Sequence, residues 1–163
     1  MRYVGIDPST KCGLVILNQN GEVEVQKEIT SKVKMDPHRF MDLASQVRGY
    51  VNELDVICIE GFSYGSKGRG VSTQYGIGWS IREELIRNGY EYIDIAPSGV
   101  KKFASGKGNT KKDELVLPIY KRWGFESDSD NIRDAYILAQ IAKGTVNNDE
   151  LTAFQKEVIK KIG

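Results

Sequence analysis

Cysteine is scarce in this chain, since Cys12 and Cys58 are the only two among 163 residues. They lie far apart and form no CxxC pair, so the sequence favours neither a disulfide framework nor a zinc site. Cys58 lies within the apolar segment VICIE and is interpreted as a small core residue. These features are typical of a protein from a reducing compartment, and we expect this one in the cytoplasm.

Long apolar runs are also missing. No stretch approaches the roughly 18 residues of a membrane-spanning helix, and the first residues lack the apolar core of a signal peptide. Lys and Arg number 23 against 22 Asp and Glu, so the overall charge does not indicate an acidic partner. Without repeats or low-complexity segments, 163 residues are enough for one domain with its own core. We expect one soluble domain and no membrane partner.

The hydrophobic pattern predicts a sheet with both antiparallel and parallel strands. Segments 2–7, 12–18 and 22–30 predict three antiparallel strands, with an Asn-Gly turn signal between the last two. The apolar runs at 56–60 and 91–95 predict two parallel strands, of which the first would lie beside 2–7. The expected fold class is α/β, a mixed five-stranded sheet flanked by helices.

Helical periodicity and capping signals predict the remaining elements. Asp36 and Pro37 would start a helix that ends near Asn52. Ser72 or Thr73 would cap a second helix that ends near Asn88. A further helix is expected at 111–123, with Thr110 as N-cap and a kink or split at Pro118. Another is expected at about 130–143. A polar break at 144–149 would precede a last helix that ends at 162.

Acidic residues end the predicted strands at one edge of the sheet. Asp7 ends the first strand and Glu60 the fourth, so parallel pairing about 4.8 Å apart would place both at the carboxyl edge. Asp134, with Asp130 one turn before it, lies near the start of a helix whose apolar face predicts packing on the sheet. Each acid alone could be a turn or cap residue. Together they need a cation, and oxygen ligands favour Mg²⁺ or Mn²⁺, so we hypothesise a two-metal site for phosphodiester hydrolysis.

Two Gly-rich loops carry local positive charge. The segment 97–112 has five lysines and no acid, namely Lys101, Lys102, Lys107, Lys111 and Lys112. Its Gly-Lys-Gly core would let backbone amides approach phosphates. The loop at 61–70 adds Lys67, Arg69, Phe62 and Tyr64, a combination that suits stacking on an unpaired base. Solvated surface loops are the alternative interpretation of both.

Other conspicuous residues are assigned to structure. His38 is expected at the surface or as a helix cap, and Trp79 and Trp123 in the core. The segment GKGNTKK lacks the P-loop order GxxxxGK[ST], so we expect no nucleotide binding there.

The order of these motifs resembles the RuvC family of Holliday junction resolvases, within the ribonuclease H-like fold. GIDPSTKCG is similar to the family's first strand and Asp, ICIEGF to its fourth strand and Glu, and DNIRDAYILAQIA to its last catalytic helix. APSGVKKFASGKGNTKKDE is similar to its Gly-x-Gly and lysine segment. The resemblance covers residues 1–143, taken as the nuclease domain, and leaves 144–163 as a helical extension. The extension and the small size suggest a phage or mobile-element variant.

This resemblance implies a homodimer that cuts four-way or branched DNA, with two Mg²⁺ or Mn²⁺ ions per active site. It implies Asp7, Glu60 and Asp134 as catalytic metal ligands. It further implies Lys101, Lys107 and Lys112 as DNA contacts, with Lys112 nearest the active site.

One position departs from the family pattern. The family usually has Asp or His three residues before the last Asp, where this chain has Asn131. Either Asp130 replaces that ligand from one helical turn away, or Asn131 coordinates through its amide oxygen.

The main hypothesis is therefore a metal-dependent endonuclease that is selective for branched DNA. A more general fork or flap nuclease and a non-catalytic DNA-binding relative remain alternatives. The actin and sugar-kinase ATPase superfamily shares the first half of the fold but needs two such domains. The helix at 72–88, with Trp79 and Ile86 among its apolar residues, is either a dimer surface or packs on the sheet.

Overall fold

The computed structural model describes residues 1–162 and contains a five-stranded sheet in the order β3-β2-β1-β4-β5. β1 (Tyr3–Asp7), β2 (Cys12–Leu17) and β3 (Val23–Ile29) are paired antiparallel, with β2 in the middle of the three. β4 (Val56–Glu60) pairs parallel with β1, and β5 (Ile93–Ile95) pairs parallel with β4. The predicted mixed α/β sheet is confirmed.

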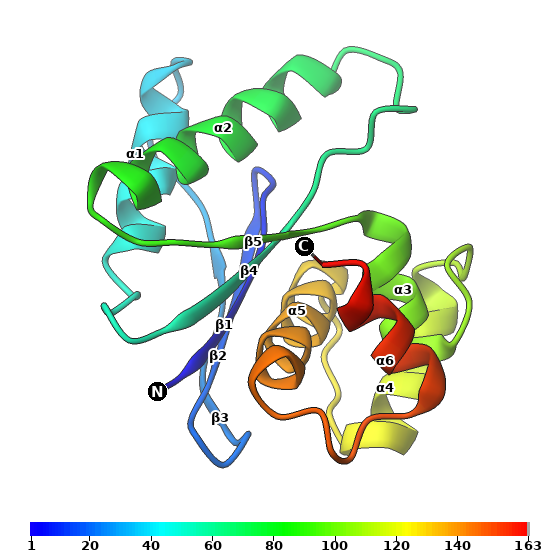
Figure 1. Ribbon diagram of the computed structural model, residues 1–163. Helices are drawn as coiled ribbons and strands as arrows, with labels where there is room; N and C mark the ends of the chain where they lie inside the picture. Colours follow the sequence, from blue (N-terminus) through cyan, green and yellow to red (C-terminus); the bar gives the residue numbers. More distant parts are fainter. Residues whose placement is uncertain (163) are drawn as a thin grey trace.

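Helices cover both faces of this sheet (Figure 1). α1 (His38–Arg48) and α2 (Val71–Arg87) lie together on one face, and α5 (Asp130–Val146) crosses the other. α3 (Pro97–Ser105), α4 (Val116–Trp123) and α6 (Ala153–Lys160) gather around α5. Because side chains alternate along a strand, Val4 and Ile6 pack on the α1 and α2 side, whereas Tyr3 faces α5. Burial on both faces explains the continuous apolar runs of β1 and β4.

α5 lies directly on the sheet at two glycines. A Cβ on Gly5 would stand 1.9 Å from the carbonyl oxygen of Ala135, and one on Gly13 would stand 2.1 Å from that of Asn131. No other residue fits so close an approach of helix and strand. The first two turns of α5 are thereby held against β1 and β2. The predicted packing of this helix on the sheet is confirmed.

Two predicted helix starts are wrong. α2 begins after Gly70 without a side-chain cap, so Ser72 and Thr73 lie inside its first turn. Thr110 caps no helix, because its hydroxyl donates to the carbonyl of Lys107 at 2.9 Å within the loop.

The segment after this loop is divided, but not at Pro118 as expected. A 3₁₀ turn (Asp113–Leu115) precedes α4, and Pro118 lies in the first turn of α4. A proline there removes no helical hydrogen bond, so the break falls before it rather than at it. His38 is exposed at the start of α1, and Trp123 packs beside the core near Phe103, both as expected.

The C-terminal helix belongs to the layer around α5. α5 continues to Val146, beyond the expected end at 143, and α6 follows after a short connection. Gln155 of α6 donates to the carbonyl of Phe103 in α3 at 3.1 Å, and Val158 is buried. α6 therefore packs on α3. Within residues 1–162, none of the helices has both the length and the apolar character needed to cross a membrane.

Candidate active site

Asp7 and Glu60 end neighbouring strands at the carboxyl edge of the sheet. Each is the last residue of its strand, and the parallel register pairs Ile6 with Ile59. Asp134 lies in the second turn of α5, close enough for its charge to act on both. Asp7 and Asp134 are each only 6% exposed. Strand pairing and the packing of α5 thus bring together the three carboxylates named from the sequence.

Burial and mutual repulsion act on these carboxyl groups. Burial raises the pKa of Asp7 well above its usual value, and the charges of Glu60 and Asp134 raise it further. Burial also raises the pKa of Glu60 to about 7, with the charge of Asp134 as the next cause. Burial raises the pKa of Asp134 as well. Carboxylates that are difficult to ionise together are stabilised by a cation that joins them.

Lys112 supplies positive charge at the same place. Its Nζ lies 3.2 Å from Oδ2 of Asp130 and 3.7 Å from Oδ2 of Asp134. Partial burial opposes the charge on Lys112, but these two carboxylates outweigh it and raise its pKa. Partial burial also opposes ionisation of Asp130, yet the hydrogen bond from Lys112 lowers its pKa. Lys112 therefore adjoins the acidic cluster, by which we mean Asp7, Glu60, Asp130 and Asp134.

The acidic cluster has the chemistry of a site for a divalent cation. Its donors are carboxylate oxygens, which suit Mg²⁺ and Mn²⁺. Burial raises the pKa of both Asp7 and Glu60, and the charge of Asp134 raises both further. Within residues 1–162, no three His, Cys, Asp or Glu side chains are grouped so that they could hold an ion as they stand. A bound cation would offset the mutual repulsion of these carboxylates.

The start of α5 is held by a contact that sequence analysis missed. Ser129 caps the helix by accepting a hydrogen bond from the N–H of Ile132 at 3.1 Å. The Ser129 hydroxyl in turn donates a short hydrogen bond to Glu28 of β3. This link holds the acidic end of α5 over the sheet. A serine before Asp130 is a capping signal, but nothing in the sequence indicates Glu28 as its partner.

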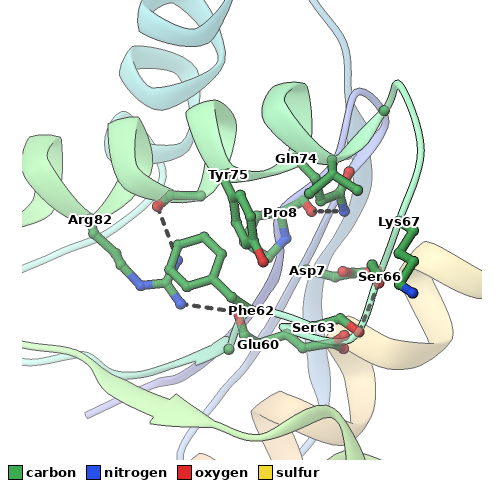
Figure 2. Close-up of a pocket in the computed structure, with 14 residues that line it drawn as sticks. Asp7, Pro8, Glu60, Phe62, Ser63, Ser66, Lys67, Gln74, Tyr75 and Arg82 are labelled. Carbon is green, nitrogen blue, oxygen red and sulfur yellow. Dashed lines mark hydrogen bonds between the residues drawn. The ribbon is translucent and has the colours of Figure 1, made fainter.

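A pocket of about 340 Å³ opens beside the acidic cluster (Figure 2). Asp7 and Glu60 belong to its lining, and the loop at 61–70 and α2 form most of the rest. Phe62 and Lys67, two of the predicted DNA contacts, line this pocket. In Figure 2 the ring of Phe62 lies against the guanidinium of Arg82.

Aromatic rings gather around Phe62. The ring centroid of Phe62 lies 5.1 Å from that of Tyr75 and 4.8 Å from that of Trp79. Trp79 is 55% exposed, so its predicted place in the core is wrong, because it lies outside the face of α2 that packs on the sheet. Tyr64 is 82% exposed, and its ring centroid lies 6.2 Å from that of Phe62. Sequence analysis missed Tyr75 and Arg82, which α2 brings to the pocket.

The other basic residues differ in their surroundings. Lys101 is near enough to Glu60 to favour the ionised carboxylate, against the effect of burial. Lys102 instead forms an ion pair with Glu157 of α6 at 2.5 Å. Exposed positions are found for Lys67, Arg69, Lys107 and Lys111.

Comparisons with known proteins give one relative and several similar structures. No protein-family model matches the chain. The crossover junction endodeoxyribonuclease RuvC of Chlamydia muridarum (strain MoPn / Nigg) is 25% identical over 150 residues, which cover 83% of this chain and 87% of the relative. The Thermus thermophilus RuvC structure matches with a TM-score of 0.70 and 16% identity over 91% of this chain and 97% of that chain. T. thermophilus RuvC in complex with a Holliday junction substrate matches with a TM-score of 0.67 and 16% identity, over 85% and 90% of the two chains.

The sheet order and the two helical layers are those of the ribonuclease H-like fold. Among such folds, the chain resembles that of RuvC over nearly the whole of both chains. The resemblance to the RuvC family of Holliday junction resolvases is confirmed.

Proposed function

We propose that this chain is a metal-dependent endonuclease that resolves Holliday junctions by hydrolysing phosphodiester bonds. The observation that carries this proposal is the convergence of Asp7, Glu60 and Asp134 at one edge of a RuvC-type sheet. The relative of 25% identity is named a crossover junction endodeoxyribonuclease, and one similar structure is a complex with a Holliday junction. Four-way DNA is accordingly the proposed substrate.

The acidic cluster would hold two divalent cations, Mg²⁺ or Mn²⁺. When bound, such cations activate a water and stabilise the leaving oxygen of a phosphodiester. Asp7, Glu60 and Asp134 would be the main ligands, and Asp130 or Asn131 would complete the set. Lys112, already in contact with this cluster, would hold an ammonium beside the scissile phosphate and balance its charge.

Residues around the cluster would hold the DNA. The lysines of the 97–112 segment would contact phosphates, which position a duplex without reading its sequence. The loop at 61–70 would contact bases that are unpaired at the branch point. The proposed DNA contacts are Phe62, Tyr64, Lys67, Arg69, Lys101, Lys102, Lys107, Lys111 and Lys112.

A homodimer is part of this proposal, because symmetric cleavage of a four-way junction needs two active sites. Trp79 and Ile86 of α2 are 55% and 62% exposed and would face a second copy of the chain. We also propose residues 1–143 as the nuclease domain. The extension at 144–163 would support the lysine segment, because α6 packs on α3.

Cleavage of synthetic DNA tests the proposal. A four-way junction, a fork and a linear duplex are compared with Mg²⁺ or Mn²⁺, using the wild-type protein and Asp7→Asn. We expect paired symmetric nicks in the junction, lost in Asp7→Asn while junction binding is retained. Equal cutting of fork and junction would indicate a general branch nuclease. Binding without cutting under either metal would indicate a non-catalytic relative.

A further inference from the structure

Arg82 is only 1% exposed although it carries a full positive charge. A charged side chain is rarely buried this completely, and a buried charge needs partners that replace water. Arg82 reaches from α2 towards the end of β4 and lines the pocket beside the acidic cluster (Figure 2). The hydrogen-bond partners of Arg82 therefore indicate its role.

The guanidinium of Arg82 joins three structural elements. Its Nη1 donates to the carbonyl of Gly78 in α2 at 3.0 Å. Its Nη2 donates to the carbonyl of Glu60, the last residue of β4, also at 3.0 Å. Its Nε donates to Oδ1 of Asp94 in β5 at 3.1 Å, and Nη2 contacts the same oxygen.

The same guanidinium also supports the aromatic side of the pocket. Its central carbon lies 4.5 Å from the ring centroid of Phe62, well within the range of a cation–π interaction. Gly61, between Glu60 and Phe62, donates its N–H to the carbonyl of Ile95 at 2.8 Å, the last contact with β5. Arg82 thus holds both residues that flank the point where the chain leaves the sheet.

We infer that Arg82 is a positioning residue of the candidate active site: it holds the end of β4 and the ring of Phe62, and so determines where the Glu60 carboxylate enters the acidic cluster. This inference rests on the proposed nuclease function of the cluster. Arg82 acts through the backbone of Glu60 and not through contact with the reacting groups. The hydrogen bond from Arg82 goes to the backbone carbonyl of Glu60 and leaves the Glu60 carboxylate free to bind a cation.

Arg82→Lys is the informative substitution. Lysine keeps the charge, but one ammonium on a flexible chain cannot bridge three acceptors in different directions or lie flat on an aromatic ring. Loss of groups that orient metal ligands typically costs about 10- to 100-fold in metal affinity or activity. We expect a loss of that order in the Mn²⁺ affinity of the DNA-free protein, measured by electron paramagnetic resonance, and in kcat for junction cleavage.

Arg2→Lys is a matched control at the opposite end of the sheet, where β1 and β4 begin. Arg2 donates through Nε and Nη2 to the two carboxylate oxygens of Asp55 at 3.0 and 2.7 Å, and through Nη2 to the carbonyl of Tyr50 at 2.9 Å. Its replacement breaks a comparable set of bonds far from the acidic cluster. We expect both Arg2→Lys and Arg82→Lys to lower the thermal unfolding temperature. Arg2→Lys should leave Mn²⁺ affinity and kcat unchanged.

The outcomes are distinguishable. If Arg82→Lys and Arg2→Lys both keep the Mn²⁺ affinity and kcat of the wild type, the positioning role is overturned and Arg82 serves stability alone. If the wild type cuts no branched DNA but Arg82→Lys still weakens Mn²⁺ binding, the proposed function fails while the positioning role stands. Should Arg82→Lys not fold, Asp94→Asn replaces it, and an unchanged Mn²⁺ affinity in that variant overturns the inference.

Discussion

Gly5 of β1 faces the carbonyl oxygen of Ala135 in α5 so closely that a Cβ on Gly5 would stand 1.9 Å from that oxygen. Gly5 lies on the same strand as Asp7, and Ala135 follows Asp134 in the chain. The contact therefore determines how near the two carboxylates come to each other. Since a backbone oxygen cannot rotate away, any side chain at position 5 has to push the helix off the sheet.

Gly5→Ala should accordingly destabilise the protein by about 1–3 kcal/mol or more, as overpacking of a dense core does, and abolish junction cleavage. The free energy of unfolding in urea measures the first effect. Gly65→Ala is the control for stability, because a Cβ there meets nothing within 4 Å. Equal stability of the two variants would show that α5 moves freely over β1.

The metal-free protein should lose stability as the pH rises from about 4.5 to about 7. The pKa of Glu60 is about 7 in the folded protein against an ordinary value of 4.5, so the folded state retains a proton that the unfolded chain releases. The raised pKa of Asp7 acts in the same direction. Urea unfolding in the presence of a chelator measures this slope. Glu60→Gln should make stability less dependent on pH, and saturating Mg²⁺ should oppose the loss of stability. A wild-type stability that rises with pH over this range would contradict the prediction.

Lys112→Met should lower kcat for junction cleavage by about 100-fold or more, the usual cost of removing one group that stabilises developing charge. The reason is the position of Nζ, which lies 3.2 Å from Asp130 and 3.7 Å from Asp134. Lys111→Met is the matched control, because Lys111 is exposed and is proposed to contact phosphate alone. It should weaken junction binding and reduce its salt dependence at unchanged kcat. Identical effects of the two substitutions would remove the special role of Lys112.

Asp130→Ala should weaken Mn²⁺ binding by about tenfold or more, and Asn131→Ala should weaken it less. The Asp130 carboxylate lies at the cluster beside Lys112, whereas the backbone carbonyl of Asn131 lies against Gly13 of β2. Calorimetric titration with Mn²⁺ ranks the two variants. The reverse order would identify the Asn131 amide as the ligand that completes the site.

The sheet and its three carboxylates could be predicted because they depend on short-range rules. Continuous apolar runs indicate strands buried on both faces, and Asp7 and Glu60 directly end two of them. Right-handed crossovers then place those strands side by side. The apolar residues of α5 also indicate a helix that packs on the sheet, and this packing places Asp134 at the same edge.

Helix starts and the face of α2 were harder to predict, because they depend on competing local contacts. Thr110 has the chemistry of an N-cap, but its hydroxyl bonds within its own loop. Trp79 has the character of a core residue, but the face of α2 that packs on the sheet excludes it. In both cases the residue type suggested a role, but the side chain makes its contacts elsewhere in the fold.

The order of the elements, the mixed sheet and the acidic residues at its edge follow from the amino-acid sequence alone, because hydrophobic periodicity and the residues at strand ends can be recognised along the chain. Three contacts follow from the folded structure and not from the sequence: Gly5 with Ala135, Glu28 with Ser129, and Arg82 with the carbonyl of Glu60. These contacts join residues that are far apart along the chain, and no sequence pattern indicates which pairs will meet. They exist because elements that bury their apolar faces against one sheet must share its limited space.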